Sequence, residues 1–451
     1  MLTGIVIGAG DRGYDSYAKA LLDQPGLGRV VAVADPDEGR RRRFAERYGL
    51  DDDACFPGWD EICAEPRLAD WALVATGDRH HVEPTLAALA AGYHVLLEKP
   101  MALDEADCVR LVEAAESADR ILGVCHVYRF SHLFDRLHRV VASGALGQVL
   151  SIQQSENVAW WHYAHSYVRG HTRRSDVPWL LQKSCHDLDV ITWLAGSTAV
   201  EVSSFARSTE LTDANAPEGA PEHCIEGCPH QPDCPYDAVA LYRDLRPLLG
   251  DLTHTARPRG LSTVAKVARR ALPLAREAPV ASIRSAAEWW RWPVSAVTDD
   301  HTPEGLDTAL RTTRWGRCAW KVGDNDQPSA QSVQIRYAND VVASFLLQSS
   351  SHRSMRYVRV DGTEGSAFGH LYALDGELTV VDHRGGPTHH EHLPATFDGH
   401  GGGERPLFLD FLAAVRDGRE PRTSARASLE SHRIAFAALR SAEIGETVRL
   451  R

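Results

Sequence analysis

The sequence predicts the α/β fold class with two domains, and three observations support this. Over residues 1–124, short apolar β runs alternate with helical patterns, which is typical of a parallel sheet covered by helices. Over residues 125–451, segments such as "AQSVQIRYA" and "GELTVVDH" alternate in period two, which predicts the half-buried strands of an α+β domain. The length of 451 residues also exceeds that of one ordinary hydrophobic core.

The composition narrows the class of protein further. A hydrophobic share of 43% and a charged share of 24% are typical of a globular protein in water. The formal net charge of −12 disfavours a general surface for nucleic acid or anionic membranes. No run approaches the about 18 apolar residues of a membrane span, and the first residues lack the basic start of a signal peptide. We therefore expect a cytoplasmic protein whose nine cysteines are reduced.

A glycine motif follows the first predicted strand, Ile5–Ile7. The segment reads GAGDRG and continues as a helical pattern, so a GxGxxG motif stands between a strand and a helix, as dinucleotide binding requires. The first glycine permits a tight turn, the second lets a pyrophosphate approach the backbone, and the third packs helix against strand. The residues predicted at the phosphates are Gly8, Gly10, Asp11, Arg12 and Gly13.

The next predicted strand, "RVVAVAD", ends in Asp35. A carboxylate about 20 residues beyond the glycine motif binds the ribose hydroxyls of NAD and repels the 2′-phosphate of NADP. NAD is therefore the predicted cofactor and NADP the less favoured one. The arginines at 40–43 could soften this preference, although a solvated helix face accounts for them better.

Two further strands, Trp71–Ala75 and His94–Leu97, flank a predicted helix near Val82–Ala91. Open α/β sheets bind ligands at the carboxyl ends of their strands. The first of these ends carries the loop "TGDRHH" and the second carries "EKP", so Lys99 is predicted to point out of the strand end into a site. The residues predicted beside the cofactor here are Thr76, His81, Glu98 and Lys99.

These motifs, with "HVLLEKPMAL" and the later "CHDLD", resemble those of the glucose–fructose oxidoreductase, inositol dehydrogenase and MocA (Gfo/Idh/MocA) family. The resemblance covers most of the chain, but residues 206–316 fit it less well and form a predicted insertion. It implies a Rossmann domain, an open-faced, mostly antiparallel sheet that often makes homo-oligomer contacts, and C-terminal helices that pack back on the first domain. It also implies that Lys99 touches both nicotinamide and substrate hydroxyl, and that His81 lies near the cofactor.

The stretch "LQKSCHDLDVITWLAG", residues 181–196, reads as a helix that stops at Gly196. The resemblance places His186 beside the reacting hydroxyl, where it works with Lys99 as an acid–base pair. A neutral imidazole can accept an alcohol proton near neutral pH, and a lysine cation can stabilise the developing alkoxide. Asp189 follows on the same side of the helix, so it could orient the imidazole or serve packing or capping.

This stretch departs from the family pattern at Gln182, where the family has an aspartate four residues before the histidine. Glutamine cannot act as a base, so a dyad of Lys99 and His186 is predicted in place of the usual triad. Cys185 could be a nucleophile, but nothing around it resembles a cysteine hydrolase, and a small buried residue is the simpler interpretation.

A segment rich in aromatic and basic residues, 156–176, precedes this helix and is predicted to cover the nicotinamide face. Aromatic rings stack on sugars, and arginine binds carboxylates through its forked donors. A packed aromatic loop with solvated arginines is the alternative. The predicted substrate residues are Tyr128, Arg129, Trp161, His162, Arg169 and Asp189. A small carbohydrate, neutral or anionic, would fit.

Three cysteines, Cys224, Cys228 and Cys234, lie in a proline-rich part of the insertion. In a reducing compartment their spacing favours a structural zinc ion over disulfides. Free buried thiols are the second interpretation, and an iron–sulfur cluster or a disulfide is the third. The candidates for the fourth ligand are His223, His230, Cys185 and Cys318.

Three function classes follow. The leading one is an NAD-dependent oxidoreductase acting on a hydroxyl of a sugar, sugar acid or cyclitol. The alternative is an NAD-dependent glycosidase that oxidises the sugar transiently and forms no net NADH, which Gln182 and the basic aromatic segment keep open. A catalytically silent NAD-binding protein is the third, and the presence of both Lys99 and His186 argues against it. The basic stretch 256–292 predicts a solvated helix or a lid, or less simply a surface for a partner or a lipid.

Overall fold

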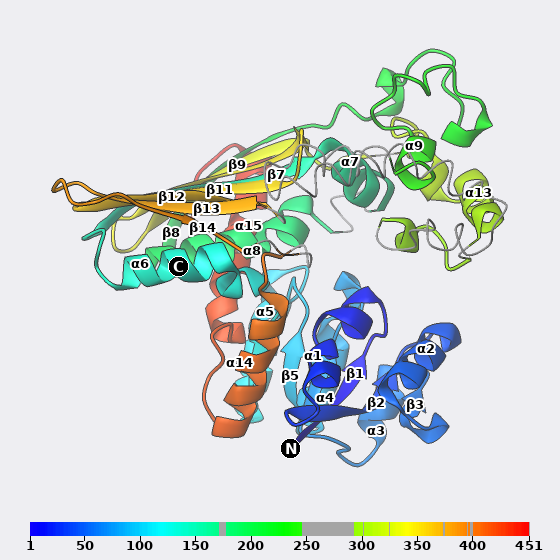
Figure 1. Cartoon of the computed structure of the whole chain (residues 1–451), viewed down its shortest axis with the longest axis horizontal. Coiled ribbons are helices and arrows are strands. Elements are labelled where there is room, and N and C mark those ends of the chain that lie inside the picture. Colours follow the sequence, from blue (N-terminus) through cyan, green and yellow to red (C-terminus); the bar gives the residue numbers. More distant parts are fainter. Residues whose placement is uncertain are drawn as a thin grey trace.

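The computed structural model describes residues 1–170, 177–245, 293–300, 302–323, 325–372, 375–394, 396 and 400–450. The basic stretch 256–292 lies outside these residues. The described chain forms two sheets with helices around them (Figure 1). None of its helices combines the length and the apolar character needed to span a bilayer.

The first sheet is the predicted Rossmann sheet, with six parallel strands in the order β3-β2-β1-β4-β5-β6. The strands are β1 (Leu2–Ile7), β2 (Gly28–Ala34), β3 (Cys55–Phe56), β4 (Trp71–Val74), β5 (His94–Leu97) and β6 (Leu122–Val124). Its helices are α1 (Lys19–Asp23), α2 (Glu38–Tyr48), α3 (Trp59–Ala64), α4 (Val82–Ala90) and α5 (Glu105–Ser117). The strands at Trp71 and His94 and the helix at Val82 thus form as predicted.

The segment after the glycine motif differs from the continuous helix that its pattern predicts. A π-helical turn, η1 (Arg12–Ser16), comes first, and α1 begins only at Lys19. Asp11 occupies the N-cap position of η1, but its side chain makes no capping hydrogen bond. The side chain of Arg12, at the first position of η1, contacts Glu98 and Glu404, which lie after β5 and in a C-terminal helix.

The second sheet has nine strands in the order β14-β13-β12-β11-β7-β10-β9-β8-β15. The strands are β7 (Val149–Ala159), β8 (Ala199–Arg207), β9 (Ala330–Tyr337), β10 (Val342–Ser351), β11 (Met355–Gly362), β12 (Gly365–Tyr372), β13 (Asp375–Asp382), β14 (His389–His392) and β15 (Val448–Arg449). Only the pair β7–β10 is parallel among these strands, so the sheet is mostly antiparallel, as expected.

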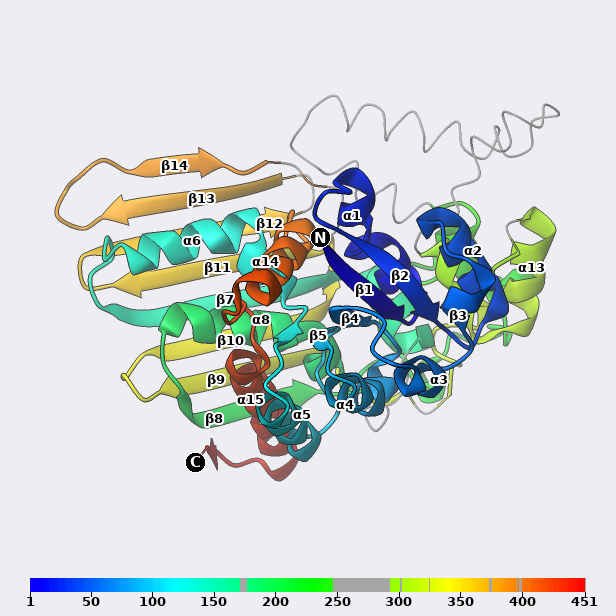
Figure 2. The ribbon, with the colours of Figure 1, turned by 90° about the horizontal axis from the view of Figure 1, so that it is seen from below.

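Three helices cover one face of this sheet: α6 (His132–Ala142), α8 (Trp179–Ala195) and α15 (Ala425–Ile444) (Figures 1 and 2). Helix α8 ends at Gly196, whose φ of 63° is the left-handed cap that the sequence predicts. The opposite face carries large apolar side chains that remain 40–73% exposed. They are Phe205, Val342, Leu346, Tyr357 and Phe368.

The C-terminal helices contact the helix layers of both sheets. Helix α15 packs on both α5 and α8, and Leu429 of α15 lies in the same apolar cluster as the Rossmann strands (Figure 2). The segment after α14 (Glu404–Asp417) adds a backbone hydrogen bond from Val124 N–H to the Thr423 carbonyl, 2.8 Å. These contacts hold α8 close to the carboxyl ends of β5 and β6.

The insertion leaves the sheet between two neighbouring strands. Arg207 at the end of β8 pairs with Ala330 at the start of β9, so the excursion spans 208–329, compared with the predicted 206–316. Its described helices are α9 (Ala238–Tyr242) and α13 (Pro303–Thr312), with short 3-10 turns η7 (Cys224–Glu226) and η9 (Arg314–Gly316). They lie at one end of the molecule beside α7 (Trp160–Tyr163) (Figure 1).

Candidate active site

The glycine motif forms a cradle that fits a pyrophosphate. Gly8 has φ of +99°, and a Cβ there would lie 2.5 Å from the Ala75 carbonyl oxygen. A Cβ on Gly13 would lie 1.9 Å from the Gly8 oxygen, so both positions exclude a side chain. Around Gly10, by contrast, a Cβ would meet no atom within 4 Å. The open space thus lies over the glycine that a phosphate must approach.

Asp35 lies at the carboxyl end of β2 and is only 5% exposed. Its two carboxylate oxygens accept hydrogen bonds from the N–H groups of Ala9 at 2.7 Å and Asp37 at 2.9 Å. An ionised carboxylate has about four acceptor positions, so both oxygens keep capacity for ribose hydroxyls. Of the neighbouring arginines, Arg41 donates to the Asp35 carbonyl at 2.6 Å and Arg43 lies over the Tyr14 ring.

The side chain of Arg12 is bound by protein groups, and its predicted role at the phosphates stays a prediction. Its guanidinium contacts the carboxylates of Glu98 and Glu404, each at 2.6 Å, and the hydroxyl of Tyr17. Burial opposes ionisation of Glu98, but the charges of Arg12 and then Lys99 outweigh it and lower the pKa of Glu98 to about 2. This network joins the glycine motif to β5 and to α14.

The loop after β4 supports the end of β5. Thr76 donates its hydroxyl proton to the His80 carbonyl at 2.7 Å. The ring of His81 is fully buried, with Nδ1 2.6 Å from the Pro100 carbonyl and Nε2 3.1 Å from the Thr76 carbonyl. His81 therefore fixes the backbone beside Lys99, and its nitrogens are occupied by the protein.

Lys99 bridges the two domains. Its Nζ donates to the backbone carbonyl of Gln182 on α8 at 2.8 Å. An ammonium has three donors, so this contact orients Lys99 while leaving donors for a ligand. The Gln182 side chain accepts a hydrogen bond from the Tyr167 hydroxyl at 2.8 Å. The position that departs from the family pattern is thus held by an aromatic residue of η5 (Ala164–Gly170).

His186 projects from α8 into the same region. It is 3% exposed, and neither ring nitrogen has a hydrogen-bond partner among the described residues. Burial, followed by the charge of Lys99, lowers the pKa of His186 well below its usual value. The imidazole is therefore neutral. A buried polar group without a partner is costly, so these nitrogens point to a ligand.

His126 is a site residue that the sequence-based prediction did not include. Its ring lies 5.6 Å from that of His186, is fully buried, and has neither nitrogen partnered among the described residues. Burial lowers the pKa of His126 to about 4. The rings of Tyr128 and His400 also lie within 6 Å of the His186 ring. The sequence did offer one signal for His126, which follows the end of β6 by two residues. Ligands of such sheets bind at the carboxyl ends of the strands.

A buried charge network lies below these rings and was also missed. Arg356 of β11 contacts Asp187 at 2.8 Å, Glu156 at 2.9 Å and the Tyr128 hydroxyl at 2.6 Å. Lys183 lies 3.4 Å from Glu156. Desolvation raises the pKa of Glu156 and lowers that of Lys183. The network fixes the segment that carries His186 on the inner face of the sheet.

Three predicted substrate residues make buried structural contacts. Arg129 forms a buried two-pronged ion pair with Asp189, with both N–O distances 2.7 Å, so Asp189 does not orient His186. Arg169 is fully buried and donates to the carbonyls of Tyr236 and Arg317 at 2.7 and 3.0 Å. A buried cation needs partners where it lies, and Nη1 of Arg169 has no hydrogen-bond partner among the described residues, so a role of these residues toward substrate stays a prediction.

The remaining candidates lie on or near the site. Tyr128 faces His186 with ring centroids 5.1 Å apart. His162 of α7 lies 3.4 Å from the Ser354 hydroxyl, and its pKa is lowered by burial and then by the charge of Lys183. Trp161 belongs to the apolar cluster of the insertion with α9 and α13. The segment 156–170 therefore links the site to the insertion.

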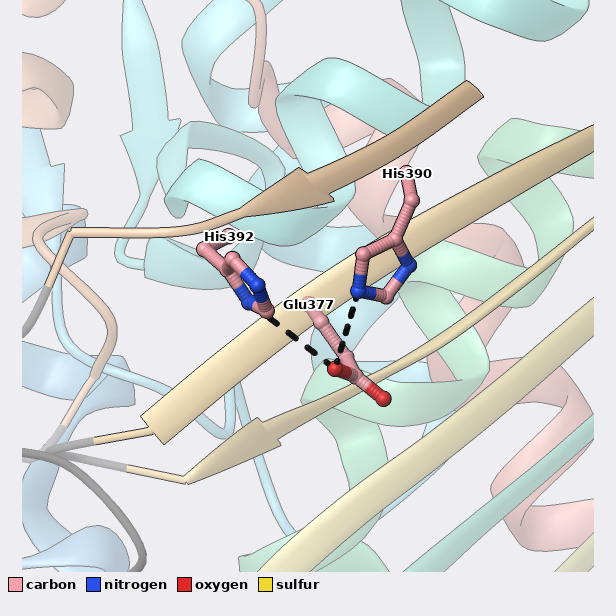
Figure 3. A group of neighbouring side chains, drawn as sticks. All are labelled: Glu377, His390 and His392. Carbon is pink, nitrogen blue, oxygen red and sulfur yellow. Dashed lines mark ion pairs between the residues drawn. The ribbon is translucent and has the colours of Figure 1, made fainter. Parts of the chain in front are cut away.

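One group of potential metal ligands on the second sheet lies apart from these residues. Glu377 of β13 faces His390 and His392 of β14, at 3.5 and 3.9 Å (Figure 3). Among the described residues, only here do three such ligand atoms all lie within 4.8 Å of one another. The three side chains are 37–47% exposed and pair with one another, so their arrangement requires no ion.

Comparison with known proteins agrees with this geometry. Residues 3–126 match the family model described as "Oxidoreductase family, NAD-binding Rossmann fold". Residues 321–450 match "Oxidoreductase family, C-terminal alpha/beta domain". Inositol 2-dehydrogenase 2 of Saccharopolyspora erythraea is 30% identical over 210 residues, which are 44% of this chain and 55% of the relative. The chain thus spans about half the length of the curated relatives it matches.

Solved structures resemble the chain over its whole length. Levoglucosan dehydrogenase in complex with NADH and levoglucosan has a TM-score of 0.66, at 16% identity and 99% coverage of both chains. An oxidoreductase from Agrobacterium radiobacter in complex with NAD+, L-tartaric acid and magnesium has a TM-score of 0.65, at 15% identity and coverage of 99% and 98%. At these identities the likeness establishes the fold alone.

Proposed function

Because the chain belongs to the Gfo/Idh/MocA family of oxidoreductases, we propose that it is a dehydrogenase of a sugar, sugar acid or cyclitol. It transfers hydride between NAD and a hydroxyl-bearing carbon. The observation that carries this proposal is the buried His186 imidazole, whose two nitrogens lack hydrogen-bond partners among the described residues. The positive charge of Lys99 adds to burial in lowering the pKa of this imidazole. The cradle of Gly8, Gly10 and Gly13 and the carboxylate of Asp35 would hold NAD.

The two residues have complementary roles. NAD, when bound, supplies the hydride acceptor. His186 is neutral, so a ring nitrogen can take the proton of the substrate hydroxyl. Lys99 is oriented by its hydrogen bond to Gln182 and presents its remaining N–H donors to the developing negative charge on the substrate oxygen. The reverse sequence serves ketone reduction, and neither direction requires a metal.

The proposed substrate class rests on the similar proteins and on the positive charge of Lys99. A relative named inositol 2-dehydrogenase and a structural neighbour bound to levoglucosan support a polyol. The ammonium of Lys99 keeps donors beyond its hydrogen bond to the Gln182 carbonyl, so an anionic carbohydrate belongs to the proposed class.

A substrate screen tests the proposed function. Purified protein with NAD is mixed with cyclitols, sugars, sugar acids and aryl glycosides, and the absorbance band of reduced nicotinamide is followed. We expect NADH to accumulate with at least one polyol. Release of the aglycone without net NADH would favour the glycosidase instead. NAD binding with no redox change across the panel would contradict the dehydrogenase.

Cofactor preference depends on Asp35. We expect the wild type to bind NAD more tightly than NADP, because the carboxylate repels a 2′-phosphate. Asp35→Ala should narrow this difference and also weaken NAD binding, since the Ala9 and Asp37 N–H groups lose their acceptor. Asp37→Ala is the matched control, because it removes a cap of α2 without the ribose contact. Titrations in which the wild type binds NADP equally well would contradict the prediction.

We also propose that the open face of the second sheet makes a homo-oligomer contact. Its exposed residues include Phe205, Leu346 and Tyr357, on β8, β10 and β11, and large apolar side chains repeated over one sheet face are typical of an interaction surface. Leu346→Glu should reduce the molar mass measured by light scattering. Leu22→Glu, at an equally exposed leucine of α1, should leave it unchanged. A wild-type protein that is monomeric at micromolar concentration would refute this.

A further inference from the structure

Four cysteines from separate parts of the insertion line one small cavity. They are Cys224, Cys228, Cys234 and Cys318, and the cavity is also lined by His230 and Trp320. Cys318 lies about 85 residues beyond the other three in sequence. All four are free thiols, and the void between them measures about 10 Å³. That is room for one atom-sized group.

Backbone contacts hold the two cysteine-bearing segments together. His223 and Arg317 form an isolated antiparallel bridge. The Cys318 N–H donates to the Glu222 carbonyl at 2.9 Å. The Cys224 thiol lies 3.8 Å from the Arg317 carbonyl. The fold therefore brings Cys318 to the loop of the other three by specific pairing.

The loop that carries three of the thiols has little other structure. Between β8 and α9 the only helical elements described are two 3-10 turns, Asp213–Asn215 and Cys224–Glu226. Long loops without secondary structure are uncommon in compact domains unless something else orders them. Cys224 of this loop is 6% exposed, and Cys318 of the neighbouring segment is 5% exposed.

A buried arginine lies beside the cysteine-bearing segments: Arg169 is fully buried. Arg169 donates to the carbonyls of Tyr236 and Arg317, which adjoin the cysteine-bearing segments. A buried guanidinium beside four sulfurs suits a centre of several thiolates, whose negative charge it offsets.

We propose that Cys224, Cys228, Cys234 and Cys318 are the four thiolate ligands of a metal centre that fastens this loop to η9. Cys318 is the proposed fourth ligand, because it lines the same cavity as the other three and its N–H pairs with the loop at the Glu222 carbonyl. Cys185 does not line the cavity and lies on α8 near Lys99. The centre is structural and independent of the proposed hydride transfer.

Four thiolates suit either a zinc ion or an iron–sulfur cluster. A tetrahedral zinc site with Zn–S bonds of about 2.3 Å places its sulfurs about 3.8 Å apart. No three of these four sulfurs lie within 4.8 Å of one another. Zinc binding would therefore draw the sulfurs closer together, and metal content distinguishes the two.

The first experiment measures zinc, iron and acid-labile sulfide in full-length protein purified without oxygen or chelator from zinc- and iron-supplemented cells. About one zinc per chain supports the centre as a zinc site, and iron with equimolar sulfide supports it as a cluster. Protein with neither overturns the proposal. Native alkylation followed by mass spectrometry should label the partly exposed Cys63 before any of the four ligands; equal labelling also counts against the proposal.

Variants then test the ligand set. Serine at each of the four cysteines should lower metal content at least several-fold, whereas Cys63→Ser and His230→Gln should retain it. Full metal content in Cys318→Ser, or its loss in His230→Gln, would overturn the assignment of the fourth ligand. His230→Gln and the alkylation pattern give a result even if a cysteine variant fails to fold.

Discussion

His186→Ala and Lys99→Ala are each expected to lower turnover by about 10²-fold or more, the usual contribution of a positioned acid–base group. The reason is that the imidazole is neutral and unpartnered among the described residues, while Lys99 is held against Gln182. NAD binding should survive in His186→Ala, because the phosphate cradle lies on the other domain. Initial rates and cofactor titration measure the two effects separately.

A matched control and a pH profile sharpen this test. His138→Ala removes a half-buried imidazole that stacks on Trp193 away from the site, at 3.7 Å between centroids, and should keep wild-type turnover. Because burial lowers the pKa of His186, the acid limb of kcat/KM should lie below the ordinary histidine value of about 6.5. Wild-type turnover in both alanine variants would place the chemistry elsewhere.

Arg356→Met is expected to destabilise the protein by about 3–5 kcal/mol, the cost of breaking a buried ion pair from one side. Its removal leaves Asp187 and Glu156 facing each other without their shared cation, and both are almost completely buried. Chemical denaturation monitored by tryptophan fluorescence gives the free energy of unfolding. Arg359→Met on the same strand is the control. Arg359 forms an exposed ion pair with Asp361, and such surface pairs contribute little to the free energy of unfolding.

The double variant Arg356→Met/Asp187→Asn separates charge from packing. It removes one carboxylate with the arginine and leaves Glu156 paired with Lys183. If uncompensated charge causes the loss, the double variant should be more stable than Arg356→Met alone. A double variant that is no more stable would attribute the loss to the packing of the arginine against the Tyr128 ring.

The elements that the sequence predicted well are those with local signals. The glycine motif, the strand before Lys99 and the helix that ends at Gly196 each rest on a few consecutive residues whose turn or cap chemistry is specific. Helical periodicity also placed His186 on α8. In these cases the residues that determine the structure are neighbours in sequence, so no long-range contact is needed.

Long-range pairing accounts for what the sequence could not show. Arg356 reaches Asp187 across 169 positions, and Arg129 reaches Asp189 across 60. An arginine near aromatic residues resembles a substrate ligand until its partners in the fold are known, which are a carboxylate for Arg129 and two backbone carbonyls for Arg169. His126 was overlooked because a single histidine has no pattern. The bridge between His223 and Arg317 brings Cys318 to the loop of Cys224, a pairing that no local pattern shows.

The point where the insertion departs from the sheet has a consequence for how this enzyme type can diversify. Arg207 and Ala330 are cross-strand partners, so a two-residue turn could join β8 to β9 directly. The closure entropy of such an excursion grows only slowly with its length. The excursion can therefore vary in length without a change in the register of β8 and β9. Since it packs on Trp161, and its Gln327 side chain accepts a hydrogen bond from the Trp179 N–H of α8 at 3.0 Å, such variation would alter the surroundings of the proposed acid–base residues.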